Sequence, residues 1–268
     1  MTLPRNLCYT IVLDMPGNDV HRQMARLLVT SLLRTRWHGR IVVFRNGTRP
    51  VFAEGHRDLE EIVLDAQPDA QWWRTMGWKY LLRDQIDLSG IGKVLFLDCD
   101  CIALRSINHL MLGSWDIYTA PEPGRVVEFP FNGYLSESEL VTCRELHGLN
   151  SGTMGIRASR FLEVMAEWER IDAIEQLRPS KCRDQHSWNR LILDTSLRHR
   201  HFSSGEVQFP FLNNAIYPNY RRAALVHAAG RTSSEKLSLL YGLWMQTFAA
   251  DRLEEFTSIE QAATSALL

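Results

Sequence analysis

Apolar positions in the first part of the chain alternate between unbroken runs and helically spaced ones. Residues 7–13 are continuously apolar or β-branched and end at the turn formers of residues 14–18, which predicts a buried strand that feeds a loop. Residues 19–35 carry apolar side chains at helical spacing and predict an amphipathic helix. Two further runs, residues 40–45 and 61–65, predict strands. This order is typical of a right-handed parallel unit, so we expect a doubly wound α/β sheet.

The rest of the chain continues the alternation of strands and helices. An apolar run at residues 94–97 predicts a strand that leads directly into Asp98, Cys99 and Asp100. Residues 121–148, rich in proline, glycine and glutamate, predict a long irregular segment. The same periodicities predict a strand at 115–120 and helices at 72–85, 159–171, 184–194 and from 235 onward.

The chain length of 268 residues fits one large α/β domain with a terminal appendage. We expect a main domain over residues 1–234 and a helical extension over residues 235–268 that packs on it or beside it. An apolar patch in the extension includes Leu240 and Trp244. Packing on the core is its expected role, and contact with a second subunit or with a membrane surface is the alternative.

Charge and composition narrow the possible partners. The 30 basic and 31 acidic residues are interspersed and give a net charge of −1, which disfavours nucleic acid as a partner. The first residues lack the pattern of a secretory signal, and no apolar run approaches the roughly 18 residues of a membrane span. We therefore predict a cytoplasmic protein without a transmembrane segment.

Five cysteines are scattered along the chain, at positions 8, 99, 101, 143 and 182. Their number is odd and their spacing matches neither a disulfide framework nor a zinc site, so we expect reduced thiols. Cys99 and Cys101 flank Asp100, which leaves a metal site built on these thiols as an alternative.

The two acids Asp98 and Asp100 follow a predicted buried strand and therefore call for a compensating positive charge. Like charges and partial burial both oppose their ionisation. Mg²⁺ and Mn²⁺ prefer oxygen ligands and bind through one or two carboxylates together with substrate phosphates. A divalent cation at the end of this strand is our hypothesis, and a pair of solvated loop acids is the alternative.

Four sequence blocks resemble family 8 glycosyltransferases, which include glycogenin and the lipopolysaccharide galactosyltransferases. The blocks are KVLFLDCDCIALRSI at 93–107, LNSGTMGIRASRF at 149–161, DQHSWNRLI at 184–192 and VHAAGR at 226–231. The resemblance spans residues 7–231. It implies a GT-A fold, with a mixed and mostly parallel sheet flanked by helices. It also implies a nucleotide-sugar donor, UDP-linked in our prediction, and retention of anomeric configuration.

The resemblance assigns a metal site and a basic residue. Asp98 and Asp100 match the family's metal-binding carboxylates, and His227 matches the histidine that completes the coordination of Mn²⁺ or Mg²⁺. A histidine packed at a strand end is the alternative for His227. Lys79 falls near the family's basic residue that contacts the donor, and an exposed helix lysine is the alternative.

Further donor-site residues are implied in the same way. Thr10, Val12 and Asp14 would hold the base and ribose, and Cys99 lies between the two acids. Asn150, Ser151 and Gly152 match the motif whose backbone turns in beneath the sugar, and an ordinary loop turn is the alternative. Gly230 and Arg231 follow the histidine and would lie near the diphosphate.

The resemblance also implies two catalytic candidates, and the sequence lacks one motif of the family. Asp184 and Gln185 match residues that line the sugar face, with Gln185 near the reacting carbon, and Asp184 is alternatively a helix N-cap. The family's Lys-Pro-Trp after the histidine is missing here. Arg231 or Lys236 is the candidate replacement as the basic partner of the diphosphate.

These residues predict a metal-dependent hexosyltransferase that acts on a hydroxyl of a saccharide, lipid-linked or protein acceptor. The cation would neutralise charge on the departing diphosphate, and retention would follow from same-face attack or from a covalent intermediate near Gln185. A catalytically weak or inactive nucleotide-sugar-binding relative, an aspartyl phosphatase and a nucleotidylyltransferase are the alternatives. The oligomeric state stays open, with a homo-oligomer among the possibilities.

Overall fold

The computed structural model describes residues 5–13, 18–47, 49–52, 56–65, 75–128, 135–175, 183–212 and 220–248. Asp14, Cys182 and residues 249–268, on which some of the predictions fall, lie outside the described residues. Within the described ranges, no helix combines the length and the apolar character needed to cross a bilayer.

The main sheet has seven strands in the order β3-β2-β1-β4-β7-β6-β8. Strands β3, β2, β1 and β4 are parallel, β7 runs antiparallel to β4 and β6, and β8 runs parallel to β6. The bounds are β1 Arg5–Val12, β2 Gly39–Arg45, β3 Leu59–Val63, β4 Ile91–Leu97, β6 Ile117–Arg125, β7 His147–Arg157 and β8 His199–His201. The predicted mixed, mostly parallel sheet of the GT-A fold is confirmed.

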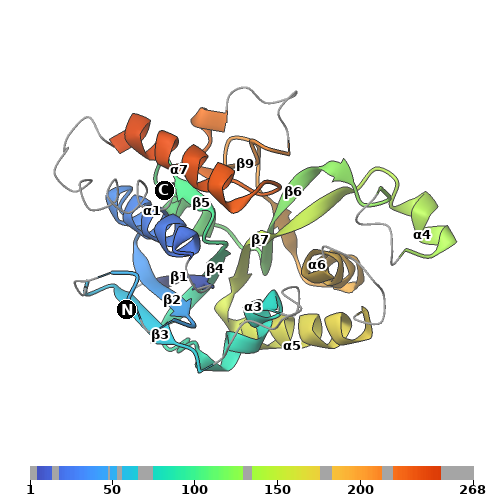
Figure 1. Ribbon diagram of the computed structural model, residues 1–268. Helices are drawn as coiled ribbons and strands as arrows, with labels where there is room; N and C mark the ends of the chain where they lie inside the picture. Colours follow the sequence, from blue (N-terminus) through green and yellow to red (C-terminus); the bar gives the residue numbers. More distant parts are fainter. Residues whose placement is uncertain are drawn as a thin grey trace.

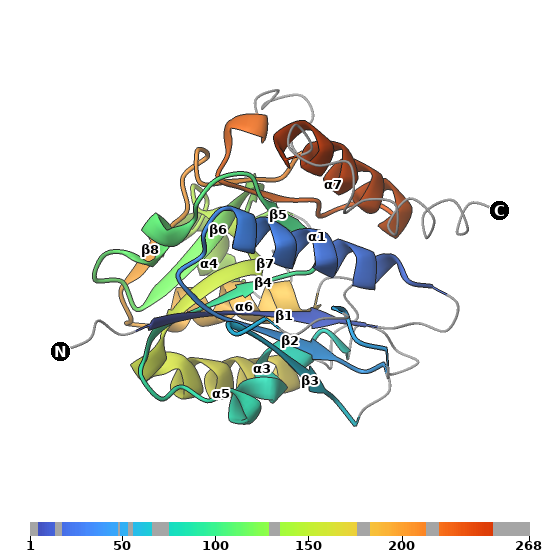
Figure 2. The ribbon, with the colours of Figure 1, turned by 90° about the vertical axis from the view of Figure 1, so that its left-hand side faces the viewer.

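Helices cover both faces of this sheet, as Figure 2 shows. Helix α1 lies on one face, and α3, α5 and α6 lie on the other. Their bounds are α1 Val20–Arg34, α3 Trp78–Leu81 with the 3-10 helix η1 Leu82–Gln85, α5 Ala158–Glu175 and α6 Arg183–Asp194. In β1, Cys8 and Val12 enter the α1 core, while Leu7 and Tyr9 enter the opposite core. The strands therefore appear as unbroken apolar runs because each face is buried.

A second, smaller sheet packs against the last helix of the described residues. It pairs β5 Cys101–Ala103 with β10 Leu225–His227, and β10 with β9 Val207–Gln208. Helix α7 Ser233–Phe248 lies beside α1 (Figure 1). Its residues Leu240 and Trp244 are buried in a core shared with α1. The described part of the apolar patch thus packs on the core. The boundary at residue 234 stays a prediction.

The structure corrects the prediction for residues 121–148. Strand β6 continues through Pro121 to Arg125, and helix α4 Glu137–Thr142 follows before β7 begins at His147. The ladder between β6 and β7 is irregular between Pro121 and Arg125. Proline fits a strand where no ladder hydrogen bond is required from its nitrogen, so the composition concealed an extended segment. Short 3-10 helices η2 Asn108–Met111 and η4 Tyr220–Arg222 complete the described elements.

One alternative is wrong and one boundary is shifted. Residues 150–155 form the middle of β7, so the alternative of an ordinary loop turn is wrong. Strand β3 begins at Leu59, two residues before the predicted start, because its pairing with β2 extends to Ile41. The helix predicted at 72–85 is seen, in its described part, as α3 followed by the 3-10 helix η1.

Candidate functional site

A tight turn at the end of β4 presents the two acids. The Cys101 backbone amide donates a hydrogen bond to the Asp98 carbonyl at 3.1 Å, and the Asp98 amide donates to the Gly152 carbonyl of β7 at 2.8 Å. The turn joins β4 of the main sheet to β5 of the small sheet. Asp98 and Asp100 therefore stand at the carboxyl end of a central strand, where ligands bind in open α/β sheets.

Pairing in the small sheet brings His227 to these acids. In the antiparallel ladder of β5 and β10, His227 lies opposite Cys101, and the Ala228 amide donates to the Asp100 carbonyl at 2.9 Å. His227 Nε2 lies 3.1 Å from Asp100 Oδ1 and 3.7 Å from Asp98 Oδ2. The histidine is 2% exposed, so strand pairing brings a buried imidazole between the two carboxylates, where Thr153 Oγ1 lies 3.5 Å from its Nδ1.

The donor atoms fit a small divalent cation. Asp100 Oδ1 is buried and has no hydrogen-bond partner, although His227 Nε2 lies nearby. Asp100, Cys101 and His227 each offer a ligand atom, and the three atoms lie within 4.8 Å of one another. Burial, with the charges of Asp100 and Asp98, raises the pKa of the Cys101 thiol, and a thiol in its protonated form is a poor metal ligand. Carboxylate oxygens and an imidazole nitrogen are therefore the better ligand set here.

Lys79 is built into the same centre from helix α3. Its ammonium lies 2.9 Å from Asp184 Oδ2 and 3.3 Å from Asp98 Oδ1, and it donates to the Ser151 carbonyl at 3.2 Å. Burial lowers the pKa of Lys79, but the charges of Asp184 and Asp98 outweigh burial and leave that pKa raised. The residue is 4% exposed, so the alternative of an exposed helix lysine is wrong.

A second lysine, Lys236 in the first turn of α7, contacts the other acid. Its Nζ donates to Asp100 Oδ2 at 2.6 Å. Burial opposes ionisation of Asp100, yet the charges of His227 and Lys236 hold its pKa well below the ordinary value. Burial is the main cause of the raised pKa of Asp98, and the Lys79 charge only partly offsets it. The two acids thus differ in how fully their charge is compensated.

Gly152 allows the strands to approach each other at this point. A Cβ atom added to Gly152 would overlap Asp98 Oδ2, and it would also overlap the ring of His227. Neither neighbour is a flexible surface side chain, since His227 is buried and the Asp98 carboxylate lies 3.3 Å from the buried Lys79 ammonium. Glycine is therefore required by close packing of a strand against the acids, and not by the alternative of an ordinary loop turn.

The neighbours of Gly152 on β7 connect the acids to helix α6. Ser151 Oγ donates to Asp184 Oδ2 at 2.7 Å, and the Asn150 side-chain oxygen accepts from the Gly152 amide at 2.8 Å. Asp184 lies inside α6, and its carboxylate binds Lys79 and Ser151. The alternative that Asp184 is a helix N-cap is therefore wrong.

Sequence reasoning missed one acid that touches this network, Glu122 of β6. Its Oε1 accepts from Asn150 Nδ2 at 2.6 Å, and Gln185, which is half-buried, also donates to it. Burial raises the pKa of Glu122, and these two amide hydrogen bonds partly oppose that effect. Only its position between Pro121 and Pro123 marked it in the sequence, and that pattern indicated an irregular segment.

The structure does not bring every predicted residue to the acids. Thr10 and Val12 are buried in β1, and Thr10 Oγ1 has no hydrogen-bond partner. Arg231 is half exposed, with its guanidinium 5.8 Å from the Phe211 ring centroid. In the described part of the chain, no hydrogen bond or ion pair joins these three residues to Asp98 or Asp100.

Gly230 and Cys99 are the remaining predicted donor-site residues. Gly230 has a φ of +92°, which favours glycine, and a Cβ atom there would press on Leu212. Cys99 is half-buried and packs against apolar clusters on both sides of the turn. Burial, together with the charges of Asp100 and Asp98, raises the pKa of the Cys99 thiol, which disfavours a metal site built on both cysteines.

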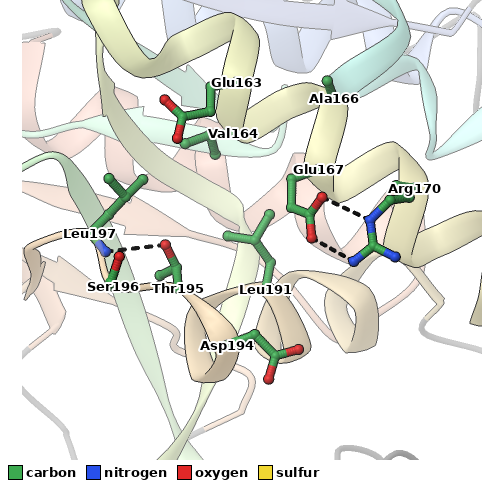
Figure 3. A pocket seen from close by; sticks show the side chains of 10 residues that line it. All are labelled: Glu163, Val164, Ala166, Glu167, Arg170, Leu191, Asp194, Thr195, Ser196 and Leu197. Atoms are coloured by element: carbon green, nitrogen blue, oxygen red, sulfur yellow. Dashed lines mark hydrogen bonds and ion pairs between the residues drawn. The ribbon is translucent and has the colours of Figure 1, made fainter.

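Two cavities differ in their relation to the acids. The larger, of about 590 Å³, lies between α5 and the end of α6, and none of the predicted site residues lines it. Figure 3 shows the Glu167 and Arg170 pair at its rim, with an N···O distance of 2.6 Å. The smaller, of about 220 Å³, includes Glu122 and Phe209 in its lining and adjoins the acid centre. The larger of these two cavities is therefore not the one that adjoins the candidate functional residues.

Comparison with known proteins supports the fold. The chain is similar to a crystal structure of a glycosyltransferase involved in glycosylation of the major capsid of PBCV-1, with a TM-score of 0.59 and 11% identity. The match covers 89% of this chain and 100% of that one. No protein-family profile and no curated protein sequence matches the chain. The comparison establishes a shared glycosyltransferase fold, and the resemblance to family 8 stays a prediction.

Proposed function

We propose that the chain is a metal-dependent glycosyltransferase that moves a hexose from a nucleotide sugar, UDP-linked, to a hydroxyl acceptor. The observation that carries this proposal is the convergence of Asp98, Asp100 and His227 at the carboxyl end of β4 in a fold shared with a glycosyltransferase. The buried Asp100 Oδ1 supports it, since this oxygen faces His227 Nε2 at 3.1 Å without a hydrogen bond of regular geometry, and a cation could be held by both atoms.

The cation would be held by carboxylate oxygens of Asp98 and Asp100 and by Nε2 of His227. When bound, Mn²⁺ or Mg²⁺ supplies positive charge that stabilises the diphosphate as it departs. The protein itself contributes position and charge. Lys79 places a fixed ammonium between Asp98 and Asp184, and its three hydrogens already face three protein acceptors, so it would orient these acids for the donor.

The sugar of the donor would lie over the segment that contains Asn150, Gly152 and Gln185. This placement is supported by the close approach that Gly152 permits and by the amides of Asn150 and Gln185, which meet at Glu122. Asp184, held by Lys79 and Ser151, would accept hydrogen bonds from sugar hydroxyls. Retention of configuration, by same-face attack or through a covalent intermediate near Gln185, belongs to this proposal.

Lys236 is the better candidate for the basic partner of the diphosphate. Its ammonium already lies at the acid centre, whereas the guanidinium of Arg231 lies beside Phe211 and Glu235. A cation bound by Asp100 would compete with Lys236 for that carboxylate, which would release the ammonium toward the phosphates.

Calorimetry and a hydrolysis screen test the proposal together. We expect UDP to bind tightly with Mn²⁺ and at least about tenfold more weakly with a chelator present, as charge neutralisation by the ion requires. A panel of UDP-hexoses should show metal-dependent hydrolysis of one or more donors. Failure of UDP to bind with the metal would contradict the proposal. Binding without turnover of any donor would favour the alternative of an inactive nucleotide-sugar-binding relative.

A further inference from the structure

The cavity of about 220 Å³ beside the acid centre has a lining suited to a neutral sugar. It lies between β6 and β9, and the residues that define its chemistry are Glu122, Pro123, His147, Ser204, Gln208 and Phe209. Its volume is smaller than the roughly 300–1,000 Å³ of pockets for drug-sized ligands, which suits a single sugar unit.

Direct contacts join this cavity to the proposed donor site. The ring centroid of Phe209 lies 5.4 Å from that of His227. On the other side, Glu122 accepts a hydrogen bond from Asn150, whose side-chain oxygen in turn accepts from the amide of Gly152. Residues that line the cavity are therefore in contact with residues that lie beside Asp98 and Asp100. A ligand in the cavity would lie next to a sugar bound over Gly152.

The lining favours hydroxyl groups over phosphates. Among the described residues that line the cavity, none is a lysine or an arginine, and the carboxylate of Glu122 would repel a phosphate. Gln208, Ser204 and His147 supply polar atoms that can exchange hydrogen bonds with hydroxyls. Pro123, which is partly exposed, supplies apolar surface for the C–H face of a pyranose ring, and the buried Phe209 contributes only a small accessible area.

Glu122 retains hydrogen-bonding capacity for such a ligand. A carboxylate offers about four acceptor positions, and the amides of Asn150 and Gln185 occupy two. These two amides also fix the orientation of the carboxylate. The side chain is half-buried, so it is both held in place and reachable from the cavity.

We propose that this cavity binds the terminal sugar unit of a saccharide acceptor and that Glu122 accepts a hydrogen bond from an acceptor hydroxyl. The proposal rests on the proposed transferase function for its role, but not for the binding itself. It assigns a saccharide as the acceptor class and makes Glu122 a binding residue that orients the acceptor toward the donor sugar.

Saturation-transfer NMR on the whole chain without nucleotide tests the binding. The probes are methyl β-galactoside, methyl α-glucoside and lactose, at least one of which should receive saturation from the wild-type protein. Ser204→Trp fills the cavity from its exposed rim, and Glu122→Gln removes the charged acceptor. Each variant should weaken binding at least about tenfold, since hydrogen bonds to charged groups and cavity occupancy both contribute to affinity.

Matched variants control for indirect effects. Ser89→Trp places the same bulk in an exposed turn near β4, and Glu137→Gln removes an exposed acid from helix α4. Both should bind the probes as the wild type does. Melting curves of all four variants separate loss of binding from loss of folding, and Ser204→Trp keeps the test informative if Glu122→Gln proves unstable.

The outcomes separate this proposal from the proposed function. Absence of saturation transfer to every probe, or equal binding by the wild type and both cavity variants, overturns the acceptor site. Those results leave UDP binding and donor hydrolysis, measured on the same preparations, as the separate test of the transferase. Once a transferred acceptor is found, Glu122→Gln should raise its KM more than the KM of the donor, which a purely structural role would not do.

Discussion

The two lysines of the acid centre show how different surroundings give similar ion pairs different consequences. Lys79 is 4% exposed and contacts two carboxylates and a backbone carbonyl, whereas Lys236 makes one contact, with Asp100, from the first turn of α7. Removing one partner of a buried ion pair leaves the other charge uncompensated. In a partly exposed pair, water can take the place of the removed partner. We infer that Lys79 maintains the structure and that Lys236 is free to exchange partners.

The largest effect should come from Lys79→Met. This variant leaves Asp184 buried beside Asp98 without a cation, and we expect a loss of about 3–5 kcal/mol in the free energy of unfolding. Urea denaturation measures it. Lys93→Met is the matched control, since Lys93 contacts the carbonyls of Met111 and Gly113 instead of carboxylates. Equal losses in both variants would contradict the structural role of the Lys79 network.

A smaller but more specific effect is expected from Asp100→Asn. The amide weakens both the proposed cation site and the contact with Lys236, so transfer or donor hydrolysis should fall more than about 100-fold, beyond what loss of an outer-sphere partner causes. Turnover measured across a Mn²⁺ titration checks this. Asp65→Asn, an exposed acid after β3, should leave turnover unchanged. Full activity of Asp100→Asn would remove the basis for the metal site.

The pH dependence of stability tests the burial of His186 in helix α6. Burial lowers the pKa of His186, in α6 next to the Asp184 region, to about 4. Because its folded pKa lies below the unfolded one, the protein should lose stability as pH falls from about 6.5 toward 4, when the unfolded chain takes up a proton first. Denaturation midpoints at several pH values should show a shallower slope for His186→Gln. The exposed His199→Gln should keep the wild-type slope.

The smallest effect on stability is expected from Lys236→Met. The Lys236 side chain is 22% exposed and His227 remains beside Asp100, so the free energy of unfolding should change by only about 1 kcal/mol. If Lys236 binds the diphosphate, the same variant should raise the Kd for UDP in the presence of Mn²⁺. A loss of stability as large as that of Lys79→Met would show that the two lysines do not differ as described.

The molecule also divides into parts that the sequence could predict and parts that it could not. The β1, α1 and β2 unit was predictable because strands buried on both faces and a one-sided helix leave distinct periodicities. Strand β6 was not, since Pro121 and Pro123 lie where its ladder is irregular. The resemblance suggested Asp98, Asp100 and His227 as a set, but only the pairing of β5 with β10 brings the histidine to the acids.

Other parts of the site depend on three-dimensional contacts that leave no local pattern. Nothing in the spacing of Lys79 distinguishes a buried lysine from a surface one, and the difference arises from Asp184, far along the chain. Glu122 belongs to the site through Asn150 and Gln185. Gly152 was marked as a glycine position, but the reason, contact with Asp98 and His227, emerges only from the packing of β7.

The pairing of β5 with β10 also fixes when the centre can assemble during synthesis. During synthesis, Asp98 and Asp100 leave the ribosome before His227, which follows only after most of the chain has been made. Until residues 227 and 236 have been added, Asp98 and Asp100 lack two of the partners that they have in the folded protein. The proposed cation site therefore needs residues that lie far apart in the sequence, and a chain that stops before β10 lacks both His227 and Lys236.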